Sequence, residues 1–278
     1  MFSNHTIVIT GAGRGIGASA ALQFAQHGAN VVVNDLDAAA TEATVHAITT
    51  AGGQAIAVAG NVTGPDFPAH LMKTAADTFG QLNILVNNAG YTWDGMSHKM
   101  SDEQWQAIID VHLTAPFRMI RAAAPYLRAA ASAELESGAS LSNRCIVNVS
   151  STSGLHGNIG QVNYAAGKMG VVGLTKTIAK EWGGLGIRCN AVAFGFIDTR
   201  LTRAQETQEE AIEIDGREVP LGIPAKVRAL LDKDIQLRIP LGRPATIEEA
   251  AAGIVLIASP LASYITGHVL EVTGGMGI

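Results

Sequence analysis

The segment TIVITGAGRGIG, residues 6–17, decides the fold class of this chain. A β-branched run leads directly into a loop with four glycines, and an alanine-rich helical segment follows and stops near Gly28. Glycine lets backbone approach a bound group closely, and a helix N-terminus offers free N–H groups with a partial positive charge. The segment therefore predicts a strand, a phosphate-binding loop and a helix. A tight strand-to-helix turn would need glycine too, so the loop alone is weak evidence.

The next predicted strand ends at Asp35, whose carboxylate can accept hydrogen bonds from the hydroxyls of an adenosine ribose. Its charge would repel a 2′-phosphate, so Asp35 favours NAD over NADP. Arg14 in the glycine loop is a counter-signal, because a guanidinium can bind the additional phosphate of NADP. A solvated turn is the alternative for Asp35-Leu36-Asp37. We expect NAD as the cofactor, with NADP less favoured.

Short β-branched runs alternate with alanine-rich segments of helical length along the rest of the chain. This alternation is typical of repeated βαβ units around a parallel sheet. We expect an α/β fold, namely a single doubly wound Rossmann-type domain over residues 1–278 with a seven-stranded parallel sheet. The predicted strands are His5–Thr10, Asn30–Asn34, Gln54–Ala59, Ile84–Asn87, Cys145–Val149, Ile187–Ala193 and His268–Val272.

Two segments interrupt this alternation. Small and polar residues at 129–143 predict a surface connection after a long helix that begins near Ser101. Residues 201–244 form a longer connection with mixed charges and four prolines. Connections of that length are usually functional or disordered. The family resemblance described below implies an extended substrate loop at this place.

The long connection contains an internal echo, because residues 218–225 are EVPLGIPA and residues 238–245 are RIPLGRPA. We interpret this as a local tandem duplication. Thr246 can cap the helix that follows the second copy, so that copy is expected to keep the ancestral position. The added segment, 206–225, is then expected to form a lid that excludes water from the pocket. The alternative is an oligomer contact or a disordered insertion. The apolar residues assigned to the lid are Val219, Leu221, Ile223, Val227, Leu230 and Leu231.

Ser150 and Ser151 close the fifth predicted strand, and Tyr164 and Lys168 follow in a helix rich in glycine and alanine. A spacing of four residues places the phenol and the ammonium on one helix face, where the positive charge would lower the pKa of Tyr164. Tyr164 would then serve as a general acid and base, and Ser151 could donate to a carbonyl oxygen that develops negative charge. An amphipathic helix pair is the default for Tyr and Lys alone. The serine and the glycine loop favour carbonyl chemistry instead.

Together these motifs resemble the short-chain dehydrogenase/reductase family in its single-domain form. The shared patterns are T-G-x-x-x-G-x-G at 10–17, N-N-A-G at 87–90 and Y-x-x-x-K at 164–168, with Ser151 thirteen residues before the tyrosine. The resemblance covers nearly the whole chain. It implies hydride transfer between NAD and a carbonyl or secondary alcohol, such as a 3-oxoacyl thioester, a steroid or a small ketone, with Ser151, Tyr164 and Lys168 as catalytic residues. The cofactor contacts that it implies are Gly11, Arg14, Gly15, Ile16, Gly17, Asp35, Asn61, Val62, Asn88, Ala89, Gly90, Tyr164, Lys168, Ile197 and Thr199.

Two residues depart from the family pattern. His112 stands where the family usually has asparagine, the fourth catalytic member, whose backbone carbonyl holds a water in the proton relay. His112 is therefore a candidate catalytic residue, and a packed helix histidine is the alternative. Phe194 replaces the usual proline before Gly195, which frees the backbone and can place an aromatic ring near the substrate.

Several classes of protein are disfavoured. The net charge of −5 and the lack of a long Lys/Arg run disfavour nucleic-acid binding, and no apolar run reaches membrane-spanning length. Cys145 and Cys189 lie in apolar strand-like stretches, which favours buried free thiols over a disulfide or a metal site. We expect a cytoplasmic protein without a metal. The alternatives to an enzyme are a catalytically silent dinucleotide sensor or regulator and a structural subunit, against which the intact catalytic residues argue.

Gly167, Gly170 and Gly173 recur along the helix that carries Tyr164. They would leave a flat strip on which another helix could pack closely. The family resemblance implies a homotetramer that uses such helices, and we expect one here.

Overall fold

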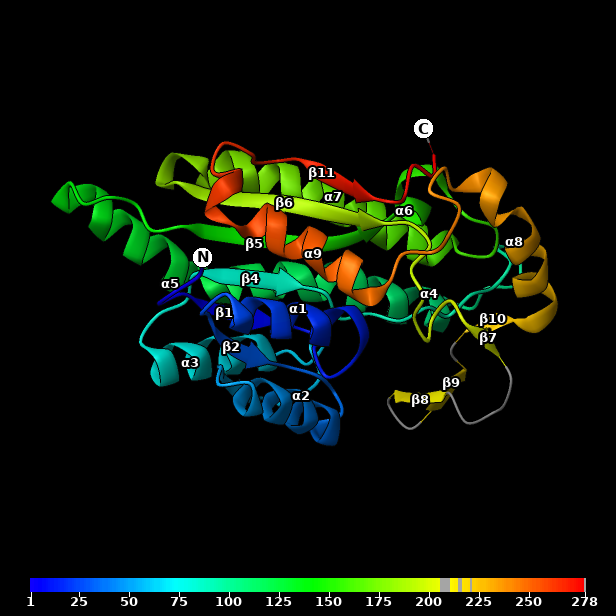
Figure 1. Cartoon of the computed structure of the whole chain (residues 1–278), viewed down its shortest axis with the longest axis horizontal. Helices are drawn as coiled ribbons and strands as arrows, with labels where there is room; N and C mark the ends of the chain where they lie inside the picture. The colour runs from blue at the N-terminus through cyan, green and yellow to red at the C-terminus, as the bar shows by residue number, and fades with distance from the viewer. Residues whose placement is uncertain (206–210, 215–216, 221, 278) are drawn as a thin grey trace.

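The computed structural model describes residues 1–205, 211–214, 217–220 and 222–277. A seven-stranded sheet runs through it in the order β11-β6-β5-β4-β1-β2-β3, and neighbouring strands pair in parallel (Figure 1). The sheet confirms the predicted α/β, Rossmann-type fold, and every predicted strand is present at its expected place. The strands are β1 (Thr6–Ile9), β2 (Asn30–Val33), β3 (Gln54–Ala57), β4 (Ile84–Asn87), β5 (Arg144–Ser151), β6 (Ile187–Phe194) and β11 (Val269–Val272).

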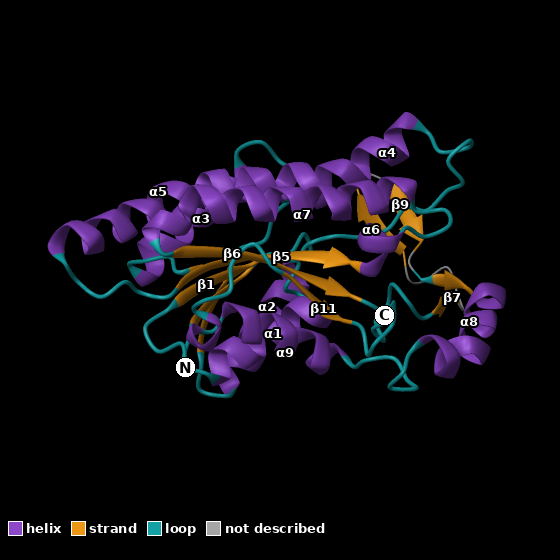
Figure 2. Cartoon of the chain, turned by 90° about the horizontal axis from the view of Figure 1, so that it is seen from above, coloured by secondary structure: helices purple, strands orange, loops and turns teal. Residues whose placement is uncertain are grey.

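Helices cover both faces of the sheet. Figure 2 shows α1, α2 and α9 on one face and α3, α5 and α7 on the other. An apolar cluster fills each interface, with Phe24 and Ile254 in one and Leu71 and Met119 in the other. Central strands buried on both faces explain why they appear in the sequence as continuous apolar runs. The helices are α1 (Gly15–Gln26), α2 (Ala38–Thr50), α3 (Phe67–Phe79), α4 (Asp102–Ile109), α5 (Ala115–Ser137), α6 (Thr152–His156), α7 (Val162–Trp182), α8 (Ala225–Arg238) and α9 (Ile247–Ala258).

The strand order reverses between β4 and β1. The connections after these two strands therefore lead to opposite faces of the sheet and leave a crevice at the carboxyl ends of the strands. Strands β5 and β6 extend further toward the crevice than predicted. They pair along their full length, from Arg144↔Ile187 to Ser151↔Phe194. Ser151 is thereby held on regular structure at the edge of the crevice.

The surface connection predicted at 129–143 is wrong over most of its length. Helix α5 continues to Ser137 and ends where Gly138 adopts a φ of 71°. The small residues that suggested a loop are mostly alanines, which favour helix, and Ala131 is fully buried in the helical layer. The long helix does begin as predicted, with Ser101 as the N-cap of α4, but a π-helical turn at Asp110–Thr114 separates α4 from α5.

The connection at 201–244 contains more regular structure than the sequence predicted. It includes two short pairs of strands and helix α8, which lie beyond the carboxyl ends of the central strands (Figure 1). The pairs are parallel β7 (Ala204–Gln205) with β10 (Ile223–Pro224) and antiparallel β8 (Ala211–Ile214) with β9 (Arg217–Pro220).

The two copies of the echoed segment share a backbone feature, since Gly222 and Gly242 both have positive φ, 95° and 71°. The second copy is attached to the segment that follows β6: the Ala245 N–H donates to the Phe196 carbonyl at 3.0 Å, and Thr246 caps α9. Of the residues assigned to the lid, Ile223 lines the crevice. Leu221 and the side chains of Val219, Val227, Leu230 and Leu231 lie outside the described residues.

Candidate active site

A cavity of about 1900 Å³ occupies the crevice. It is lined by the connections that follow β1, β2, β4, β5 and β6 and by the start of α7. Every residue that the sequence analysis assigned to cofactor binding or catalysis lines this one cavity. The fold therefore gathers residues that are spread from Gly11 to Thr199 in the sequence.

The glycine loop forms a close-fitting cradle at one end of the cavity. A Cβ atom at Gly17 would lie 2.2 Å from the Gly11 carbonyl oxygen, and one at Gly11 would lie 2.7 Å from Cα of Ala89. Gly15 has a φ of 55°, which a side chain would make costly. Among the described residues, no side chain caps the N-terminus of α1 at Arg14. The open N–H groups at the end of this helix fit a pyrophosphate.

The N-N-A-G motif joins this cradle to the sheet. The Thr10 hydroxyl accepts hydrogen bonds from the N–H groups of Asn88 and Ala89, and the Asn88 amide donates to the carbonyls of Thr10 and Gly11. The Asn87 amide donates to Asn148 across β4 and β5 at 2.8 Å. Asn88 thus positions the glycine loop, and Asn87 ties together two central strands.

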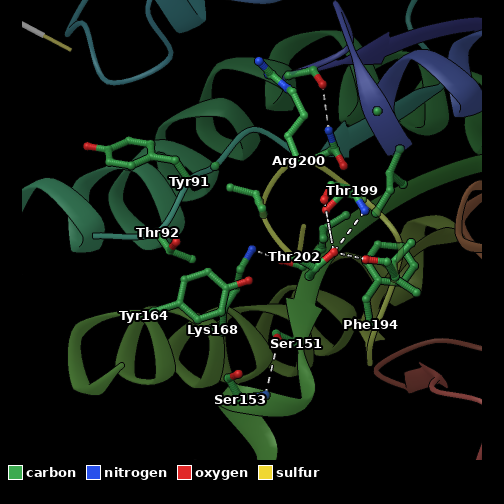
Figure 3. Close-up of a pocket in the computed structure, with 18 of the residues that line it drawn as sticks. Tyr91, Thr92, Ser151, Ser153, Tyr164, Lys168, Phe194, Thr199, Arg200 and Thr202 are labelled. Atoms are coloured by element: carbon green, nitrogen blue, oxygen red, sulfur yellow. Dashed lines mark hydrogen bonds between the residues drawn. The ribbon is translucent and has the colours of Figure 1, made fainter. Parts of the chain in front are cut away.

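Ser151, Tyr164 and Lys168 meet at the other end of the cavity (Figure 3). Ser151 comes from the end of β5, and the other two come from α7. The Ser150 hydroxyl donates to the Lys168 carbonyl at 2.8 Å, and Lys168 Nζ donates to the Val149 carbonyl at 2.7 Å. Lys168 Nζ lies 5.5 Å from the centre of the Tyr164 ring. Ser150 therefore locks the strand to the helix, while Ser151 remains at the cavity beside Tyr164.

The pKa values here differ from the expectation. Burial raises the pKa of Tyr164 to about 12; a hydrogen bond with Ser151 opposes this rise, and the Asp94 carboxylate adds to it. Burial lowers the pKa of Lys168 to about 7. The predicted lowering of the Tyr164 pKa is wrong for this structure, because loss of hydration is the largest influence on the buried phenol. With a pKa of about 12, the Tyr164 phenol is protonated at neutral pH.

His112 lies in the π-helical turn and is 3% exposed. Its Nε2 is 2.7 Å from the Tyr91 carbonyl, and since a carbonyl only accepts, Nε2 carries the proton. The imidazole meets the Tyr164 ring edge to face at 4.9 Å, and its Nδ1 has no partner within the described part of the chain. Burial and the nearby Lys168 charge hold the His112 pKa well below its usual value. His112 is thus a neutral imidazole packed against the candidate proton donor.

Three further positions show what sequence reasoning missed or left open. Fully buried Asn163 accepts from the Tyr164 N–H at 2.7 Å and donates to the carbonyls of Trp93 and Gln104, so it fixes the start of α7. Its place directly before the tyrosine was the available signal. Asp94 lines the cavity and accepts from Gln161 at 2.9 Å, but only the fold brings it there. Phe194 is buried at the end of β6 and also lines the cavity.

The glycine strip on α7 is used differently from the prediction. A Cβ at Gly167 would lie 3.0 Å from Cβ of His112, and one at Gly170 would lie 2.8 Å from the Leu113 side chain. Only Gly173 of the three faces open space. The strip therefore receives the π-helical turn of the same chain, and it is not evidence for packing between subunits.

The structure also describes the cysteines, the side chains that could hold a metal ion and the helices that could span a membrane. Cys145 and Cys189 are buried free thiols. Within residues 1–205, 211–214, 217–220 and 222–277, we find no group of three or more His, Cys, Asp or Glu side chains arranged to hold a metal ion. Among the helices of those residues, none combines the length and the apolar character that a membrane span requires.

Comparison with known proteins agrees with this geometry. The family model for short chain dehydrogenase matches residues 5–210, and the model described as enoyl-(acyl carrier protein) reductase matches residues 223–277. A 3-oxoacyl-(acyl-carrier-protein) reductase of Thermotoga maritima is 38% identical over 98% of this chain and 97% of its own. Proteins of the same description from Synechocystis sp. and Staphylococcus aureus are 39% and 37% identical over 97% and 99% of this chain, and over 95% and 99% of their own. The chain therefore belongs to the short-chain dehydrogenase/reductase family and is a nicotinamide-dependent oxidoreductase that acts on carbonyl and CH–OH groups.

Proposed function

We propose that the protein is an NAD-linked reductase of 3-oxoacyl thioesters. The observation that carries this proposal is the convergence of Ser151 and a protonated Tyr164 on one cavity with the glycine cradle. The relatives described as 3-oxoacyl-(acyl-carrier-protein) reductases support a thioester as the substrate class, over a steroid or a small ketone.

Reduction adds a hydride to the carbonyl carbon and a proton to its oxygen. A bound nicotinamide supplies the hydride. In our proposal Ser151 donates a hydrogen bond to the substrate oxygen, which stabilises the negative charge that develops there. Tyr164 transfers its phenolic proton to that oxygen as a general acid. Lys168 stabilises the phenolate that remains, and the product is a 3-hydroxyacyl thioester.

We propose that His112 supports this step as a positioning residue, since its ring packs against Tyr164.

The adenosine and pyrophosphate would be bound by the glycine cradle, Asp35, Asn61 and Val62. The nicotinamide end would be bound by Ile197 and Thr199. Asp35 favours NAD because it presents a carboxylate at the adenosine end of the cavity. Replacing Asp35 by Ala should raise the use of NADP relative to NAD, and an unchanged ratio would mean that the ribose contact is misassigned.

A substrate screen tests the thioester. Initial rates would be followed by nicotinamide absorbance with acetoacetyl thioester, a steroid ketone and a small unactivated ketone, each with NADH and NADPH. We expect the thioester to give the highest kcat/KM, with NADH preferred. Faster turnover of the steroid or the small ketone would contradict the proposed thioester class and assign the faster substrate's class instead. Tight cofactor binding without turnover of any carbonyl would favour the dinucleotide sensor instead.

We also propose that residues 1–278 act as one domain in a cytoplasmic homotetramer. Large apolar side chains remain exposed on the helical layer of α4, α5 and α7, among them Trp105, Phe117 and Met169. Light scattering at micromolar concentration tests the assembly. A monomer under those conditions would contradict it.

A further inference from the structure

Three backbone segments meet at the adenosine end of the cavity: the glycine loop, the turn after β2 and the start of α2. Asp35 joins the first two, because its Oδ2 accepts from the Gly13 N–H at 3.0 Å and its Oδ1 accepts from the Asp37 N–H at 3.2 Å. A Cβ at Gly13 would lie 3.0 Å from Cβ of Asp35 and 2.8 Å from Cβ of Ala40. The turn is therefore packed directly against the loop, and its carboxylates are held in fixed places.

Asp37 uses both of its oxygens. Oδ1 accepts from the Ala40 N–H at 3.1 Å and so caps α2, while Oδ2 pairs with Nη2 of Arg14 at 2.6 Å. The hydrogen bond from the Ala40 N–H lowers the pKa of Asp37 and is the largest influence on it. Burial raises this pKa by a smaller amount, and the Arg14 guanidinium lowers it further. Arg14 and Asp37 both line the cavity. The cation of the phosphate loop is thus already bound to a carboxylate.

We propose that Asp37 is a cofactor-selectivity residue that acts through Arg14. This inference rests on the proposed preference for NAD and explains how the chain keeps it despite an arginine in its phosphate loop. A 2′-phosphate needs a cationic partner, and the guanidinium fork is the side chain best suited to it. Asp37 holds that fork and adds a second negative charge beside Asp35.

The solvent exposure of Arg14 and Asp37 determines how strongly their ion pair opposes binding of a 2′-phosphate. Arg14 and Asp37 keep 48% and 38% of their side-chain surface, so the ion pair alone contributes little to folding stability. A 2′-phosphate could therefore displace Asp37 from Arg14 at modest cost. The displaced carboxylate would still lie beside the phosphate, together with Asp35, and would repel it. Asp37 therefore disfavours NADP in two ways. Its charge repels the 2′-phosphate, and its ion pair occupies the Arg14 guanidinium.

The test is equilibrium binding of NADH and NADPH without substrate, followed by nicotinamide fluorescence. Asp37→Ser removes the charge and keeps a side chain that can cap α2. We expect its affinity for NADPH to rise about tenfold relative to that for NADH, the effect of one charge-assisted hydrogen bond. Measured against Arg14→Ala, the Arg14→Ala/Asp37→Ser double variant should show a smaller gain, because only the repulsion by the Asp37 charge is then removed. Glu42→Gln, which removes an exposed carboxylate of the same helix away from the cavity, should leave the ratio unchanged.

The ratio of NADPH to NADH affinity in these variants distinguishes the role of Asp37 from that of Arg14. An unchanged ratio in Asp37→Ser would overturn the role of Asp37, and an equal gain without Arg14 would show that Asp37 acts by repulsion alone. Should Asp37→Ser fold poorly, Asp37→Asn repeats the test with another good capping residue. The wild-type ratio is a separate measurement. If wild type prefers NADPH, the proposed NAD specificity fails, while the coupling between Arg14 and Asp37 is still measured by the double-mutant cycle.

Discussion

The helix that carries Tyr164 and the connection at 201–244 face the same cavity, but they are held in different ways. Around Tyr164, fully buried Asn163 and nearly buried Lys168 make short hydrogen bonds to main-chain carbonyls. In the connection, the Arg203–Asp198 ion pair joins two side chains that are both at least half exposed. Buried, mutually satisfied groups fix a geometry, whereas exposed pairs contribute little. We propose that the chemistry depends on the buried framework around Tyr164 and that the connection sets selectivity for substrate size.

The largest effect should come from Tyr164→Phe, which removes the proton donor from the framework. We expect kcat to fall by roughly two or more orders of magnitude with the fold intact. Steady-state kinetics and NADH titration would measure turnover and cofactor affinity separately. Tyr126→Phe is the matched control, because Tyr126 packs in the helical layer and is not among the residues that line the cavity. Near-normal turnover in Tyr164→Phe would break the proposed mechanism.

A second difference should appear in folding stability. Glu134 accepts two hydrogen bonds from Arg144 at 2.6 and 2.7 Å and ties the end of α5 to β5, and the Arg144 side chain is only 4% exposed. Glu134→Gln should lower the free energy of unfolding by about 2 kcal/mol, because it leaves a buried cation without its counter-charge. Asp198→Asn, in the exposed pair, should cost less than about 1 kcal/mol. Urea denaturation of both variants measures this, and equal losses would contradict the comparison.

The same ion pair makes a prediction about acid stability. The hydrogen bond from Arg144, the first of several causes, lowers the pKa of Glu134 from 4.5 to about 2. The folded-state pKa is depressed, so this stabilisation is complete above pH 4.5 and is lost as the pH falls through about 2. Wild type and Glu134→Gln should therefore converge in stability toward acid.

The pH dependence of the reaction should follow Lys168. Burial lowers its pKa to about 7, so its ammonium form is present below that pH and is lost above it. The value of kcat/KM for NADH reports ionisations of the free enzyme, and it should fall about tenfold per pH unit above neutrality if the charge is required. A flat profile through the same range would show that the Lys168 charge is not needed.

The smallest effect should come from the connection. Deleting residues 206–225 removes the segment assigned to the lid, including Ile223, which lines the cavity. We expect a folded protein that still binds NADH but whose kcat/KM for short and long thioesters shifts in ratio by roughly tenfold or less. Unchanged selectivity would mean that the segment is not a specificity lid. Failure to fold would place it in the core or in an assembly interface.

The sequence predicted most of the framework because each signal there is local. A β-branched run, a glycine loop or a tyrosine and lysine four residues apart can be recognised without knowing the fold. The connection was harder, although Asp215-Gly216 between 211–214 and 217–220 is a dipeptide favoured in two-residue hairpin loops. This dipeptide is the local signal for the pairing of β8 with β9.

What the sequence did not predict depends on burial and on long-range contacts. The Tyr164 pKa rises because the phenol is buried, which no spacing of residues reveals. Asp94 and Asp37 acquire their places from the fold, next to Gln161 and Arg14. Gly167 and Gly170 suggested contacts between subunits but receive the π-helical turn of their own chain. A pattern of small residues indicates close packing without identifying the partner.

We propose above all that a proton from Tyr164 completes hydride transfer to the carbonyl. The direct measurement uses NADH deuterated at the transferable position of its nicotinamide, with acetoacetyl thioester as the acceptor, in single-turnover reactions of wild type and Tyr164→Phe. We predict that wild type places deuterium on the former carbonyl carbon of the 3-hydroxyacyl product, and that the variant, although saturated with NADH, transfers it at least roughly a hundredfold more slowly. Transfer at equal rates, or a product without deuterium at that carbon, would contradict the account.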